Sequence, residues 1–178
     1  MNQLRNNPDL YSSLALDIYL DLLIDEGYTN TVIDSVISTG FNNIIEANNK
    51  IKAVENFSKQ KDFEELAVTF KRVVNIAKDK PTAKLDAKLF KDSSEKNLHK
   101  TFSDISGKTE TFFKPGKITK DSEYVKALNL IKTLKKPVDD FFDSVMVMDK
   151  DEKIKNNRLA LLGEIKELFF RISDFSKI

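Results

Sequence analysis

Apolar residues recur at intervals of three and four along most of the chain, which is the spacing of one face of an α-helix. The longest such stripe lies near the C-terminus and is formed by Ile154, Arg158, Leu161, Leu162, Ile165, Leu168, Phe169 and Ile172. A second clear stripe is formed by Phe63, Leu66, Ala67, Phe70, Val74 and Ala77. The pattern predicts a long amphipathic C-terminal helix and at least one further helix that packs in the same core.

Three earlier helices are predicted before residue 60, with Pro8 in a first turn and Gly27 and Gly40 at helix ends. We expect their core faces to consist of Leu14, Ala15, Ile18, Leu22, Val32, Ile33, Val36, Ile37, Ile44, Ala47, Ile51 and Val54. Acidic residues three positions apart predict capping boxes, one at Asp62 and Glu65 and one at Asp149 and Glu152. The second would start the C-terminal helix at about Lys150, after Met146 to Met148 close the helix that Pro137 opens.

The middle of the chain is less regular. A weak helix is predicted from Ala83 to about Ser106, and because residues 91–97 contain no apolar side chain we expect an exposed arm packed only at its ends. Residues 107–120 combine a Pro-Gly turn with aromatic and lysine residues and predict a loop. The fold class is therefore all-α, a bundle of about seven helices. Residues 1–60 would lead into a bundle of residues 61–178, together forming one compact unit.

Composition narrows the functional classes. The chain of 178 residues has 5 Gly, 4 Pro and 40% hydrophobic residues, which suits a helical globular domain. Its net charge of +1 by itself says nothing about an anionic partner. The absence of Cys excludes disulfides, thiolate zinc sites and cysteine nucleophiles. No apolar run reaches the roughly 20 residues of a membrane span, and no signal-peptide core follows Met1. We therefore expect a cytoplasmic protein that does not enter membranes.

Residues with catalytic or metal-binding chemistry are scarce. His99 is the single histidine and has neither a Cys nor a neighbouring Asp, so it lacks the partners that a metal site or an acid–base pair requires. No glycine-rich phosphate loop and no nucleophile elbow is present. We expect no catalytic residue, no metal site and no cofactor in this chain.

Two segments are locally basic. Residues 71–88 contain six basic side chains (Lys71, Arg72, Lys78, Lys80, Lys84 and Lys88) and two acidic ones, and residues 108–120 contain four basic and one acidic. Such patches suit phosphate contacts, and Phe112, Phe113, Arg72 and Asn75 could stack on or bond to the bases of an RNA loop. The alternative is that the lysines solvate helix faces and the phenylalanines belong to the core. Nothing in the sequence indicates DNA binding.

Arg158 lies inside the C-terminal apolar stripe. One interpretation is a buried arginine paired with an acidic residue of the preceding helix, with Asp139, Asp140 and Asp143 as candidates. The other is a guanidinium held at the edge of the core to meet a phosphate or a base. We favour the first interpretation, because an unpaired buried charge is costly.

Two runs in the C-terminal part carry a family resemblance. Residues 137–148 read PVDDFFDSVMVM and residues 156–162 read NNRLALL. Together they resemble the C-terminal end of the bacterial glycyl-tRNA synthetase β subunit, an all-helical anticodon-binding domain of the type shared with arginyl-tRNA synthetases. Residues 25–36 and 70–76 are also similar to that family.

The resemblance implies a tRNA-binding, non-catalytic part of an enzyme that uses ATP to join glycine to its tRNA. The implied partners are the glycine tRNA, through its anticodon stem-loop, the synthetase α subunit and the rest of the β subunit. We expect an excised part of a longer polypeptide, with Met1 as an expression start. The implied RNA-binding residues are Lys71, Arg72 and Asn75, followed by Asn156, Asn157 and Arg158, whose motif also suits helix packing. The alternative function is a helical protein–protein module that docks the α subunit or another β domain.

Overall fold

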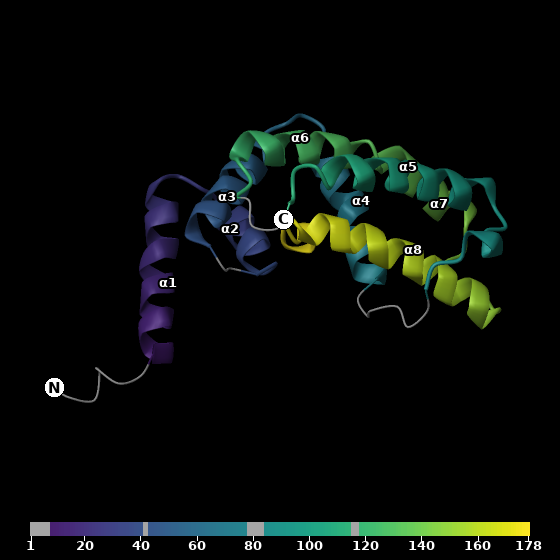
Figure 1. Cartoon of the computed structure of the whole chain (residues 1–178), viewed down its shortest axis with the longest axis horizontal. Helices are drawn as coiled ribbons and strands as arrows, with labels where there is room; N and C mark the ends of the chain where they lie inside the picture. Colours follow the sequence, from purple (N-terminus) through teal and green to yellow (C-terminus); the bar gives the residue numbers. More distant parts are fainter. Residues whose placement is uncertain (1–7, 41–42, 78–83, 115–117) are drawn as a thin grey trace.

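The computed structural model describes residues 8–40, 43–77, 84–114 and 118–178, with the backbone alone for residues 8–14. These residues form eight α-helices and two short 3-10 helices and contain no strand, which confirms the all-α prediction (Figure 1). The elements are α1 (Pro8–Asp25), α2 (Asn30–Ile37), α3 (Ile44–Ser58), α4 (Phe63–Ile76), η2 (Ala87–Leu89), α5 (Ser93–Thr109), α6 (Asp121–Lys132), α7 (Lys135–Ser144), α8 (Glu152–Phe170) and η3 (Phe175–Lys177).

The helices form an elongated bundle with α1 at one end (Figure 1). α3 packs on α6, α5 packs on α7, and α4 packs on both α8 and η3. The chain therefore returns at its C-terminus to the helices near its start. There the Asp174 backbone N–H donates to the Ser35 carbonyl at 2.7 Å, and the Ser173 hydroxyl lies 2.8 Å from the Ser35 hydroxyl.

One apolar core contains side chains from both predicted parts of the chain, residues 1–60 and residues 61–178. It includes Val32 and Val54 from the first sixty residues and Phe70, Phe169 and Phe175 from the rest. The fully buried Phe70 ring lies 4.4 Å from the Phe169 ring and 5.3 Å from the Phe175 ring, measured between centroids. α4 is thus anchored from within by aromatic residues of the C-terminal segment.

The strongest hydrophobic stripes are confirmed. Every predicted position of the α8 stripe is buried, Arg158 included, and so is every predicted position of the α4 stripe. Gly27 and Gly40 have φ values of 91° and 114°, which is the left-handed conformation expected at a helix end.

The predicted core face of α1 is wrong. Ile18 and Leu22 are 54% and 56% exposed and Ala15 is also exposed, whereas Leu23 is buried. The side chain of Leu14, the fourth predicted position, lies outside those described. Spacing identifies an apolar face but not whether another element covers it, and α1 contacts the bundle mainly through α2. Ile44, in the first turn of α3, is exposed for the same reason.

Both predicted capping boxes are wrong, because the Asp62 carboxylate pairs with Lys132 and the Asp149 carboxylate pairs with Arg158 instead. Asp62 occupies the N-cap position of α4, but its carboxylate pairs with Lys132 at 2.7 Å and caps nothing. α8 begins at Glu152, two residues later than predicted, and Asp151 caps it by accepting from the Lys153 backbone N–H. The helix before it ends at Ser144 rather than Met148.

The prediction of an exposed arm at residues 83–106 is also wrong. α5 begins at Ser93, packs on α7, and is opened by a capping box between Asp92 and Glu95. Glu95 lies in the run without apolar residues and yet is 0% exposed. A buried carboxylate requires partners. Glu95 has two local ones, the backbone N–H groups of Lys91 and Asp92, and a distant one, Arg158 of α8, which the local sequence does not indicate.

Candidate nucleic-acid interface

The outer face of α4 carries three of the predicted RNA-binding residues. Lys71, Arg72 and Asn75 are all exposed, whereas Phe70, Val73 and Val74 point into the core. The inner face of the helix is fixed by α8 and η3. The backbone beneath the exposed side chains is therefore held in place, which suits a surface that recognises a shaped partner.

Arg72 links α4 to α7 through an aromatic ring. Its guanidinium carbon lies 4.0 Å from the centroid of the Phe142 ring, a cation–π contact. Arg72 forms no ion pair with any residue in the described part of the chain. A groove of about 450 Å³ begins at this contact; it is lined by Arg72, Ile76, Phe142, Asp143, Ser144, Val145, Met146, Val147 and Met148.

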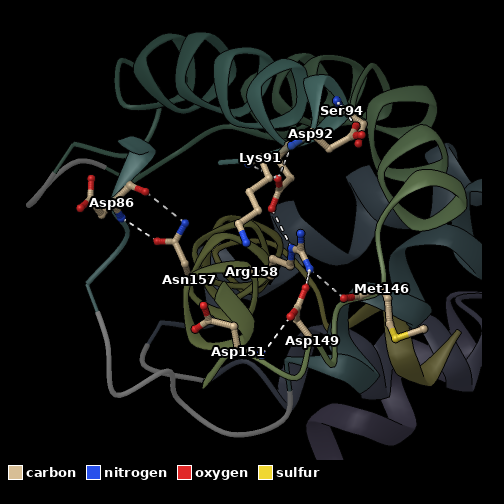
Figure 2. Close-up of polar contacts among 10 residues, drawn as sticks. Asp86, Lys91, Asp92, Ser94, Met146, Asp149, Asp151, Asn157 and Arg158 are labelled. Carbon is tan, nitrogen blue, oxygen red and sulfur yellow. Dashed lines mark hydrogen bonds and ion pairs between the residues drawn. The ribbon is translucent and has the colours of Figure 1, made fainter. Parts of the chain in front are cut away.

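Arg158 is buried and paired with two acids, as the first of its two interpretations expects, but neither acid belongs to the preceding helix. Its Nε donates to Glu95 Oε1 at 2.7 Å, and its Nη1 donates to Asp149 Oδ2 at 2.8 Å and to the Met146 carbonyl at 2.9 Å (Figure 2). The predicted partners Asp139, Asp140 and Asp143 are wrong. Two of these acids bind other groups: Asp139 accepts from Thr69 and Lys135, and Asp140 accepts from Lys136.

Asn157 is also buried and serves packing. Its side-chain amide accepts from the Asp86 backbone N–H at 2.7 Å and donates to the Asp86 carbonyl at 3.1 Å (Figure 2). This pair of bonds holds the segment before η2 against α8. Asn156 is half-buried. The structure therefore separates the exposed group on α4 from the Asn157 and Arg158 side chains, which lie inside.

The network around Arg158 contains further backbone donors. Glu95 Oε2 accepts from the backbone N–H groups of Lys91 and Asp92, each at 2.7 Å. Asp149 accepts from the Asp151 backbone N–H, and this bond, together with Arg158, lowers the pKa of its carboxyl. The pKa of Asp92 is lowered as well, first by the Ser94 backbone N–H. Carboxylates held in this way join α5, the connection after α7, and α8.

Acid is expected to weaken this junction. Because the folded-state pKa values of Asp92 and Asp149 lie below the ordinary 3.8, the stability that these carboxylates contribute is present above 3.8 and is lost as pH falls from there through the lower folded-state pKa values. The urea midpoint should stay level from neutral pH to about pH 5 and decline below pH 4. The decline should be smaller in the Asp92→Asn/Asp149→Asn variant, and an equal decline in both proteins would assign it to other groups.

The second basic segment has different surroundings. Phe112 and Phe113 are half-buried; Phe113 packs 5.7 Å from the Tyr124 ring on α6 and lies under the Arg171 guanidinium. These aromatics thus contact the bundle rather than the face of α4. The exposed Lys108 and Lys114 remain near them, whereas Lys78, Lys80 and Lys117 lie outside the described residues.

The described residues also bear on the predictions for the histidine, for metal binding and for membrane spans. His99 packs on the Phe90 ring at 5.2 Å between centroids. No group of three or more His, Asp or Glu side chains in the described ranges could hold a metal ion. None of the described helices combines the length and apolar character needed to cross a membrane.

Sequence reasoning predicted Arg72 as a binding residue but missed the two methionines that line the groove with it. Met146 and Met148 are 75% and 57% exposed, while Val145 and Val147 between them are buried. This alternation has the period of an extended segment. Read as period two rather than as the end of a helix, the run VMVM would have predicted two exposed methionines after α7.

Comparison with known proteins places these features in a family. Residues 66–172 match the family model described as DALR anticodon binding domain. A protein of Geotalea daltonii named glycine–tRNA ligase beta subunit is 46% identical over 160 residues, and one of Syntrophotalea carbinolica with the same name is 39% identical; each match covers 90% of this chain and 22% of the relative. A third, from Desulforapulum autotrophicum, is 34% identical over 99% of the chain. The chain thus spans about a fifth of the length of these curated relatives.

Proposed function

The chain belongs to the DALR anticodon binding domain family, and from this membership we propose that it binds the anticodon stem-loop of the glycine tRNA. The choice of glycine tRNA comes from the names of the relatives. The proposal extends to the role of the chain as part of a glycyl-tRNA synthetase β subunit in the cytoplasm.

The observation that carries this proposal is the exposed group on α4. Lys71, Arg72 and Asn75 lie within the family match and face outward from a helix that is anchored by its opposite side. Cationic side chains contact the RNA backbone, and guanidinium planes and amides contact unpaired bases. All three kinds of group are present within five residues of one helix.

The proposed mechanism is positional. The bundle would hold the stem-loop while glycine is joined to the distant end of the tRNA, with ATP consumed by the whole enzyme and no chemical step in this chain. A rigid contact far from the reacting atoms can contribute by orienting the substrate. The partners would be the synthetase α subunit and the rest of the β subunit.

Titration of the 178-residue chain with a glycine-tRNA anticodon stem-loop tests the proposal. We expect the Lys71→Ala/Arg72→Ala variant to bind about tenfold more weakly, because two cationic contacts are lost. The slope of log K against log salt concentration should become shallower by about 1 to 2. The matched control is Lys126→Ala, which removes an exposed charge from α6. Equal affinity of the double variant and the wild type would remove α4 from the interface.

A second function is favoured by the apolar residues exposed on α1. Ile18 and Leu22 are uncovered on one face of the helix, Ile24 is exposed on another, and an exposed apolar face marks a protein contact. This face would dock the synthetase α subunit or another β domain. Salt distinguishes the two functions, since RNA binding weakens steeply as salt rises whereas an apolar protein contact does not.

A further inference from the structure

The groove beside Arg72 has a composition that neither family membership nor the exposed lysine explains. Its lining joins one cation, one carboxylate and the uncovered side chains of Met146 and Met148. Arg72 contributes one positive charge to this lining and Asp143 one negative charge, so the formal net charge of the groove is zero. Such a site favours a flat, neutral group over a phosphate.

Arg72 provides a planar surface at one end of this groove. One face of its guanidinium lies over Phe142, which fixes the orientation of the plane. Because the residue is exposed, its opposite face can stack on a second ring. Arginine planes stack on unpaired bases in this way.

The two methionines provide an adaptable apolar wall. Their thioethers are exposed to an extent unusual for side chains of this type, and sulfur makes favourable contacts with aromatic rings. The wall is also held in place: Val145 and Val147 anchor it in the core, and Arg158 donates to the Met146 carbonyl at 2.9 Å. The exposed side chains therefore project from a fixed backbone.

We propose that this groove is a subsite for one unstacked nucleobase, held between the Arg72 guanidinium and the thioethers of Met146 and Met148. Lys71, one residue from Arg72 on α4, would contact the phosphate that adjoins this base. The subsite rests on the proposed anticodon binding. It adds a recognition role for two residues after α7 and assigns to Arg158 the part of a positioning residue.

The methionine methyl groups report on this subsite directly. The chain has three methionines, and only Met146 and Met148 line the groove. In the chain with methyl-labelled methionine, we expect the signals of Met146 and Met148 to shift when the stem-loop is added, because a stacked base produces a ring current. The Met1 signal serves as the internal control, and Met146→Leu and Met148→Leu assign the other two.

Stem-loops with one abasic position identify the base. We expect one abasic position in the loop to abolish the methyl shifts and to weaken binding by about tenfold, the size of one stacking contact. Arg72→Lys keeps the charge but removes the plane, so it should weaken binding of the intact loop by a similar factor. The wild-type chain and the Arg72→Lys variant should then bind the stem-loop that lacks this base with equal affinity.

The outcomes separate the subsite from the proposed function. Salt-sensitive binding with unmoved Met146 and Met148 signals would overturn the subsite and leave anticodon binding in place. The subsite would also be overturned, with anticodon binding left in place, if the loss of affinity from Arg72→Lys added to the loss from every abasic position. No binding of the intact stem-loop by the wild-type chain would overturn both. Shifts of the two signals on addition of a partner protein, but not of RNA, would reassign the groove to a protein contact.

Discussion

Replacing Arg158 with methionine is expected to lower the free energy of unfolding by about 3–5 kcal/mol, the range found when one partner of a buried ion pair is removed. Glu95 is fully buried and would lose the Arg158 guanidinium, which lies 2.7 Å away in the native protein. The Met146 carbonyl would also lose a donor, and Asp149 would keep only its bond from the Asp151 backbone N–H. Urea unfolding followed by circular dichroism measures the change.

A matched surface pair provides the control for Arg158→Met. Arg171 pairs with Glu110 and lies over the Phe113 ring, but the two charged side chains are 33% and 58% exposed, so Arg171→Ala should cost only about 1–2 kcal/mol. Adding Glu95→Gln to Arg158→Met should recover part of the lost stability, because a neutral amide then replaces the carboxylate that has lost its arginine partner. If Arg158→Met and Arg171→Ala were equally mild, the buried network would not stabilise the fold.

Truncating Phe70 to alanine is expected to destabilise the protein by about 3–5 kcal/mol, the cost of emptying a large buried aromatic site. The ring is fully buried between Phe169 and Phe175, so its loss leaves a cavity where α4 meets α8 and η3. Because Lys71 and Arg72 follow Phe70 directly, their placement depends on this contact. Chemical denaturation gives the stability, and stem-loop titration under native conditions gives the effect on binding.

Val68→Ala on the same helix is the control for Phe70→Ala. Val68 is 70% exposed, so its truncation should change stability by no more than about 0.5 kcal/mol. A Phe70→Ala protein as stable as Val68→Ala would mean that the aromatic cluster does not anchor α4. It would then be wrong to treat the outer face of α4 as rigid.

Hydrophobic spacing predicted the buried residues correctly where neighbouring helices cover a helix along its whole length. The stripes of α4 and α8 are buried at every predicted position, because each helix packs on neighbours throughout. At α1 the same spacing misled, since the side of the helix that bears Ile18 and Leu22 has no covering element among the described residues. Periodicity reports an apolar face, and only the tertiary arrangement decides whether that face is buried.

Polar residues were harder to place, because their partners are distant in sequence. Glu95 is 63 positions from Arg158, and neither the run around it nor the stripe around Arg158 indicates the other. The choice of Asp139, Asp140 and Asp143 relied on proximity in the chain, which a buried pair need not respect. The same limit applies to the groove: Arg72 and Phe142 come from helices that meet only in the folded chain.

The bond between Ser173 and Ser35 has a kinetic consequence. These hydroxyls are 138 positions apart, and the neighbouring backbone bond from Asp174 to Ser35 closes nearly the same interval. Helical bundles generally fold quickly when their contacts are local, and contacts of large sequence separation slow the search. Joining the ends of so long an interval requires most of the chain to be ordered first. The bonds between Ser35 and the residues Ser173 and Asp174 should therefore form after the folding transition state. Substitutions at Ser35 or Ser173 should then act mainly on the rate of unfolding.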